Sequence, residues 1–141
     1  MKKIIYFIEF ILIKFLFIIF KIIGYRLASN LGYFIGKNFG NFFRKKRSII
    51  KNLHKSKVLI NTSENKFVNN VLGNYGRILA EYPFLKDFRK NKLEQFIKID
   101  GIENLHKIKN NKKPVVFISG HFNNFELMAM QIEKNGINLA A

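Results

Sequence analysis

The chain has 141 residues, of which 48% are hydrophobic, and it contains 16 phenylalanines and no cysteine. The length is that of one domain at most, and the absence of cysteine excludes disulfides, thiol catalysis and cysteine-based metal sites. The formal charge of +16, from 25 basic and 9 acidic residues, indicates anionic partners: nucleic acid, an anionic membrane or an acidic protein. Codon bias in an AT-rich genome is the alternative explanation for the many lysines.

The first 23 residues predict an apolar helix at a membrane. Only three charges interrupt residues 4–23, and about 20 apolar residues in a helix match the thickness of a bilayer core. Lys3, Lys14 and Lys21 fall within about 20° of one another around such a helix. This basic stripe suits a membrane-anchoring helix that lies in the interface, or one that is steeply tilted with snorkelling lysines. A cleaved signal peptide is the alternative, but no small-x-small cleavage site follows promptly.

Residues 24–43 remain apolar, and Gly32, Gly36 and Gly40 recur every four residues. Two interpretations are open. The glycines can form a small-residue face that lets two helices pack closely. Alternatively, they weaken an amphipathic helix that lies along the membrane, which we favour slightly.

A basic cluster comes next in the chain. Residues 37–57 hold eight basic side chains and no acidic one: Lys37, Arg44, Lys45, Lys46, Arg47, Lys51, Lys55 and Lys57. Directly after an apolar segment, such a cluster predicts contact with anionic lipid headgroups, at about 1 kcal/mol per basic residue near the surface. It also indicates that this side of the membrane is cytoplasmic. A nucleic-acid patch is the alternative, but the adjoining membrane segment argues against it, so no nucleic-acid partner is expected.

The remainder of the chain predicts alternating helices and strands. Thr62 or Ser63 caps a helix that ends near Pro83, with apolar residues spaced four, three and four apart at Val68, Leu72, Tyr75 and Leu79. A short helix is expected within residues 84–96. Strands are expected at Phe96–Ile99 and Val115–Ile118, with a helix at Ile102–Asn110 between them. This order predicts an α/β layer structure.

The polar residues that follow the second predicted strand are the candidate site. Histidine is easily poised as a general base near neutral pH, and a carboxylate at its other ring nitrogen can orient it. His121 and Glu126 are five residues apart, or about 140° out of phase on a helix. We therefore expect His121 in a loop and Glu126 in the first turn of a helix, with Asn123 and Asn124 in a tight turn between them. A loop histidine with an unrelated surface glutamate is the alternative.

The residues around His121 give little support to a metal site or to a serine nucleophile. No third ligand is clustered near His121 and Glu126, so no metal is expected. Ser119 lacks the Gly-x-Ser-x-Gly pattern of a nucleophile elbow.

The segment Gly120-His-Phe-Asn-Asn-Phe-Glu126 resembles the His-x4-Asp/Glu signature of glycerolipid-type acyltransferases. More closely, it resembles the lipid A biosynthesis (lauroyl/myristoyl) acyltransferase family, whose usual form is His-Phe-Gly-Asn-Trp-Glu. Arg47 followed by Asn52-Leu53, and the lead-in from Gly101 to Leu105, resemble further segments of that family.

Three departures from the family pattern matter. Asn123 stands where the family has glycine, so it must adopt a backbone conformation that glycine adopts more cheaply. Phe125 replaces tryptophan. The chain ends at Ala141, where a second strand should lead into the family's Arg-Pro segment. We therefore expect it to be an N-terminal fragment that is inactive alone.

The resemblance implies transfer of a fatty acyl group from acyl carrier protein to a hydroxyl of a lipid A precursor, at the cytoplasmic face of the bacterial inner membrane. It makes His121 the general base and Glu126 its orienting partner, without metal or cofactor. Substrate-binding residues are then expected at Asn124, Arg44, Lys45, Lys46 and Arg47, and anionic membrane lipids are additional partners.

The expected organisation is a membrane-anchoring or interfacial helical segment at residues 1–43 and the N-terminal portion of an αβα acyltransferase domain at residues 44–141. Two alternative functions remain. One is a phospholipid or glycolipid acyltransferase with the same dyad. The other is a non-catalytic, membrane-anchored basic binding protein, for which His121→Ala would leave function intact.

Overall fold

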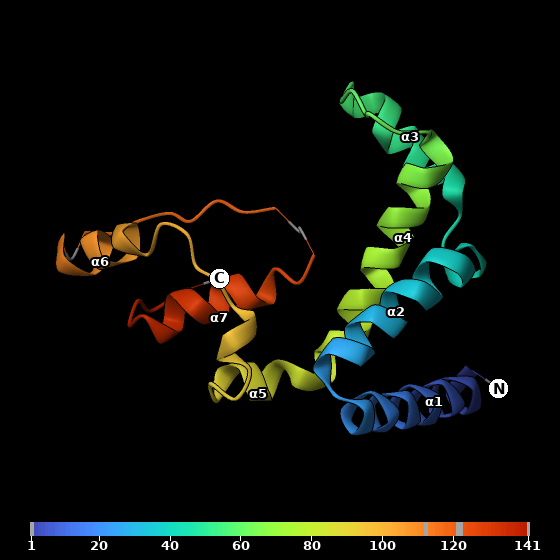
Figure 1. Cartoon of the computed structure of the whole chain (residues 1–141), viewed down its shortest axis with the longest axis horizontal. Helices are drawn as coiled ribbons and strands as arrows, with labels where there is room; N and C mark the ends of the chain where they lie inside the picture. Colours follow the sequence, from blue (N-terminus) through green and yellow to red (C-terminus); the bar gives the residue numbers. More distant parts are fainter. Residues whose placement is uncertain (1, 112, 121–122, 141) are drawn as a thin grey trace. The chain divides into compact units, whose positions relative to one another are not determined.

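The computed structural model describes residues 2–111, 113–120 and 123–140. The chain divides into two compact units, residues 1–83 and 84–141. The first unit contains α1 (Lys2–Ile23), α2 (Tyr25–Phe39), the 3-10 turn η1 (Gly40–Phe42), α3 (Lys46–Ser56) and α4 (Glu64–Glu81) (Figure 1). The 3-10 turn η2 (Tyr82–Phe84) follows α4.

The α/β prediction is wrong, because all regular elements in the described residues are helical and none is a strand. Of the two predicted strands, Phe96 ends the 3-10 turn η3 (Glu94–Phe96), and Val115–Ile118 is an irregular segment. β-Branched residues favour an extended backbone, but a strand also needs a neighbour that pairs with its N–H and C=O groups. Val116 and Ile118 are 84% and 94% exposed. The segment predicted as the second strand therefore has neither a pairing partner nor, at Val116 and Ile118, burial.

The helix predicted over the first 23 residues is confirmed as α1. One part of its predicted membrane-anchoring role is corrected, namely whether the helix spans the bilayer. Within the described ranges, none of the helices combines the length and the apolar content that crossing a bilayer requires.

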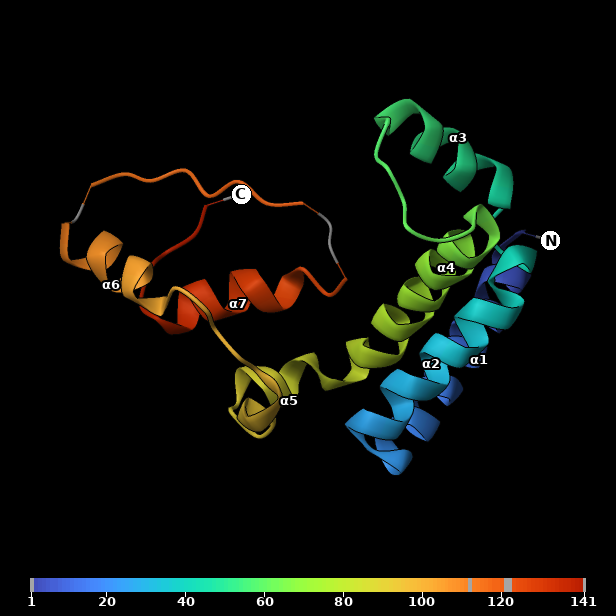
Figure 2. The ribbon, with the colours of Figure 1, turned by 45° about the horizontal axis from the view of Figure 1, so that its top comes forward.

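Helices α2 and α4 form the core of the first unit and lie side by side in both views (Figures 1 and 2). The close-packing interpretation of the glycine repeat is confirmed. A Cβ built on Gly32 would lie 2.5 Å from the carbonyl oxygen of Gly76, and one built on Gly36 would come closer still to that of Leu72. These helices contact each other through their backbones, so larger side chains at the crossing would force them apart.

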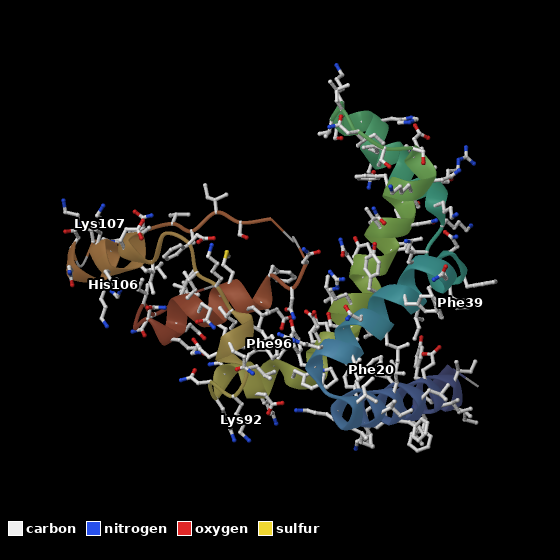
Figure 3. The ribbon with its side chains drawn as sticks, in the orientation of Figure 1. Phe20, Phe39, Lys92, Phe96, His106 and Lys107 are labelled. Carbon is white, nitrogen blue, oxygen red and sulfur yellow. The ribbon has the colours of Figure 1, made fainter. Side chains whose placement is uncertain are left out.

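The predicted helix that ends near Pro83 is confirmed as α4. Ser63 is its N-cap, and the Ser63 hydroxyl accepts a hydrogen bond from the backbone N–H of Lys66 at 3.4 Å. On the buried side, Val68 and Leu72 pack with Ile49 of α3. Helix α1 contacts α2 and contributes the buried Phe20, which is labelled in Figure 3.

The second unit contains α5 (Leu85–Arg89), η3, α6 (Ile102–Asn111) and α7 (Glu126–Lys134). The predicted helix at Ile102–Asn110 is confirmed as α6, and the short helix expected within residues 84–96 is α5. Helices α5 and α7 pack together. The Lys134 ammonium donates to Glu94 at 2.7 Å, and Arg89 pairs with Glu133 at 3.2 Å. This packing fixes the orientation of α7, on which the candidate carboxylate lies.

Candidate active site

The turn before α7 positions Glu126. Asn123 has a φ of 45°, the left-handed conformation that asparagine tolerates better than most residues other than glycine. The Asn123 carbonyl accepts a hydrogen bond from the backbone N–H of Phe125 at 3.1 Å. The Asn124 carbonyl accepts one from the N–H of Leu127 at 3.2 Å. The expected tight turn is thus confirmed, together with the unusual backbone conformation expected for Asn123.

Glu126 lies in the first turn of α7, as its spacing from the histidine predicted. A carboxylate at this end of a helix interacts favourably with the helix dipole. Its side chain is half-buried. His121 lies outside the described residues, so its proposed pairing with Glu126 remains a prediction.

The basic residues Arg44, Lys45, Lys46 and Arg47 lie at the start of α3, in the first unit. Lys45 is the N-cap of that helix, no side chain caps it, and its first turn contains no acidic residue. Positive charges at a helix N-terminus are unfavourable with respect to the helix dipole. An anion at the same place would be stabilised by both the charges and the exposed backbone N–H groups.

A shallow, open basic groove runs along this helix. It is lined by Lys45, Arg47, Ser48, Ile50, Lys51, His54 and Lys55. Of the predicted substrate-binding residues, the structure brings Lys45 and Arg47 together here. Asn124 and Glu126 belong to the other unit.

The sequence did not predict Ser48 and His54 as site residues, and it predicted Lys51 and Lys55 only as members of the basic cluster that contacts lipid headgroups. The spacing carries a signal for two of them, because Arg47, Lys51 and Lys55 recur every four residues and so share one helix face. His54 also lies 2.5 Å from Glu64 of α4, which ties α3 to the next helix. The groove could therefore have been predicted from the helical period of its cations.

A buried polar cluster elsewhere in the first unit was not predicted. Glu81 is only 6% exposed. Its carboxylate accepts hydrogen bonds from the Ser29 hydroxyl at 2.7 Å and from the Tyr25 hydroxyl at 3.4 Å. Burial raises the pKa of Tyr25 to about 12, and the neighbouring Glu81 carboxylate adds to the effect. The cluster joins α2 to the end of α4 and has a structural role.

Comparison with known proteins identifies one family. The family model described as bacterial lipid A biosynthesis acyltransferase matches residues 1–141. None of the curated proteins and none of the solved structures gives a match.

Proposed function

Because the chain belongs to the bacterial lipid A biosynthesis acyltransferase family, we propose that it transfers a fatty acyl chain from acyl carrier protein to a hydroxyl of a lipid A precursor. Family membership implies an acyl donor and a lipid A precursor as substrates. The match over residues 1–141 is the observation that carries the proposal.

In the proposed reaction, His121 removes the proton from the acceptor hydroxyl. The hydroxyl oxygen then attacks the carbonyl carbon of the acyl thioester. When the tetrahedral intermediate collapses, the carbon–sulfur bond breaks, an ester is formed, and the carrier thiol takes up the proton. Glu126 orients the imidazole and stabilises its protonated form, as the carboxylate of a catalytic triad does.

The turn before α7 supports this role for Glu126. Asn123 has a left-handed backbone conformation just before α7, and the Glu126 carboxylate lies at the beginning of that helix. Asn124 belongs to the same turn, and we assign it to substrate binding there. A regular helix from His121 onward would instead leave the two side chains on different faces.

The basic groove along α3 supports the assignment of a lipid A precursor and acyl carrier protein as partners. Its cations suit the phosphate groups of a lipid A precursor and the acidic surface of a carrier protein. Lys45 and Arg47 contribute to it directly, and Lys46 adds charge to the same helix end. Arg44 lines a different cavity.

We further propose that the protein works at the cytoplasmic face of the inner membrane. Residues 1–43 would form an interfacial helical segment, and residues 44–141 would belong to the acyltransferase domain. The apolar side chains exposed along α1 and the basic cluster that follows η1 are the combination that binds an anionic lipid surface.

The proposal is tested in membranes from cells that express the full-length gene. Acyl transfer is measured with acyl carrier protein thioester as donor, and a lipid A precursor and a lysophospholipid are compared as acceptors. We expect transfer to the lipid A precursor, with most of it lost in His121→Ala and in Glu126→Ala. Unchanged turnover in either variant would refute the dyad, and a preference for the lysophospholipid would favour the phospholipid acyltransferase alternative.

A further inference from the structure

A half-open apolar cavity of about 210 Å³ lies at the surface of the first unit. Its lining includes Phe20 of α1, Ile35 of α2, Arg44, and Leu72, Tyr75 and Leu79 of α4. Helices α1, α2 and α4 all contribute to the wall, and Arg44 is the one charged side chain among these residues. Glu126, the described residue of the proposed catalytic pair, is not among the residues that line it.

The glycines explain why a cavity remains where three helices meet. Gly32, Gly36 and Gly76 bring the backbones of α2 and α4 into contact, but they place no side chains into the space beside that contact. An apolar cavity of about 150 Å³ in another protein stays dry and takes up benzene. A cavity of this size and lining therefore accommodates several methylene groups of a hydrocarbon chain.

Arg44 determines which kind of ligand fits the cavity. Its guanidinium lies 4.8 Å from the centre of the Tyr75 ring, and both residues line the cavity. A cation beside an apolar cavity complements a ligand with an apolar chain and an anionic head. Neighbouring Phe42 and Phe43 are 85% and 89% exposed, as expected for side chains that enter a lipid interface.

We propose that this cavity binds one hydrocarbon chain of an anionic membrane lipid, with the lipid phosphate at Arg44. We take the membrane as the source of the chain because Phe42 and Phe43, the exposed apolar residues directly before Arg44 in the sequence, suit a lipid interface. The bound chain would hold the first unit against the membrane through a specific site, in addition to the charges of the basic cluster. This binding does not depend on the proposed acyl transfer.

Alkyl phosphates of increasing length, used below their micelle concentrations, test the site by titration calorimetry on the full chain. Each methylene that becomes buried strengthens binding about fourfold. Affinity is expected to rise by this factor with chain length, to level off once the cavity is full, and to saturate at one chain per protein. A continued rise without saturation would show non-specific uptake and overturn the proposal.

A matched pair of tryptophan variants tests the location. Ile35 lines the cavity, whereas its neighbour Phe34 does not, and both are more than one-third exposed. Ile35→Trp should weaken octyl phosphate binding at least tenfold, and Phe34→Trp should leave it unchanged. Leu79→Trp is a second filling variant, from α4, in case Ile35→Trp perturbs α2. Equal binding by both filling variants and by Phe34→Trp would contradict the assignment.

The charged head is tested separately. Arg44→Gln should weaken octyl phosphate binding several-fold while leaving octanol binding unchanged. Lys66→Gln, which removes an exposed charge far along α4 from the cavity lining, should change neither. Equal losses in both variants would show that net charge alone attracts the ligand, which would refute the role of Arg44.

Vesicles test the source of the chain. Phosphatidylglycerol with a photoreactive group near the end of one acyl chain should cross-link to cavity residues such as Ile35, Leu72 and Leu79. Cross-links confined to the exposed side chains of α1 would show simple surface contact. If alkyl phosphates bind but vesicle lipid never reaches the cavity, the site takes a soluble amphiphile and the membrane source is wrong.

Discussion

Replacing Gly76 with alanine has two opposing effects on the free energy of unfolding, and the size of each is known approximately. In a helix interior, alanine is more favourable than glycine by about 1 kcal/mol, so propensity alone predicts stabilisation. The structure predicts the opposite, because a Cβ on Gly76 would lie 2.2 Å from the Gly32 carbonyl oxygen and 2.9 Å from the Gly36 Cα. Both atoms belong to the backbone of α2, so no side-chain rotation relieves the overlap.

To restore an ordinary contact, the two helices would have to separate by about 1 Å, which forfeits much of the packing along their crossing. Overpacking of this kind typically costs about 1–3 kcal/mol. With a cost near the upper end and the propensity gain subtracted, we expect Gly76→Ala to lower the free energy of unfolding by about 2 kcal/mol.

Urea unfolding followed by circular dichroism at 222 nm measures this change. Amide hydrogen exchange should assign the loss of protection to α2 and α4, because the chain has two compact units and a single transition is not guaranteed. Asn65→Ala, at an exposed position of the same helix, is the control and should leave stability unchanged or slightly raised. A Gly76→Ala protein that is more stable than the wild type would refute the close crossing.

Three further predictions concern the turn, the buried tyrosine and the basic groove. Asn123→Val should destabilise the turn before α7 by about 1–2 kcal/mol, because a β-branched residue is strained at positive φ, whereas Asn123→Gly should be tolerated; thermal unfolding and acyl transfer of both variants check this. In the folded chain the pKa of Tyr25 is raised to about 12, so the unfolded chain loses the tyrosine proton at a lower pH than the folded chain does. The free energy of unfolding should therefore fall between pH 10 and 12. The fall should be smaller in Tyr25→Phe, as measured by urea unfolding across that range. Lys51→Gln combined with Lys55→Gln should weaken binding to phosphatidylglycerol vesicles and make the remaining binding less sensitive to salt, whereas Lys90→Gln with Lys92→Gln, in the second unit, should have less effect in a sedimentation assay.

Local signals in the sequence predicted the helices well. Ser63 and Pro83 mark the ends of α4, and the spacing of Val68 and Leu72 identifies its buried face. The glycine repeat predicted a close helix contact as one of two interpretations, but it could not identify the partner. That partner is Gly76 and its neighbours on α4, which are distant in the chain.

The strands could not be predicted from local signals alone. Val115–Ile118 has the composition of a buried strand, but composition does not supply a neighbouring strand, and Val116 and Ile118 are exposed. In the candidate site, the turn at Asn123 and the helical position of Glu126 followed from spacing. The cavity beside Arg44 could not be predicted from the sequence, because it depends on three helices that meet only in the folded unit.

Lipid A isolated from cells provides the most direct test of acyl transfer through His121 and Glu126. Mass spectrometry should show one additional acyl chain on lipid A when the full-length wild-type gene is expressed in a strain that lacks this activity. His121→Ala and Glu126→Ala, expressed to the same level, should leave the chain absent. The same additional chain in cells that carry His121→Ala would contradict the proposed catalytic role of the histidine.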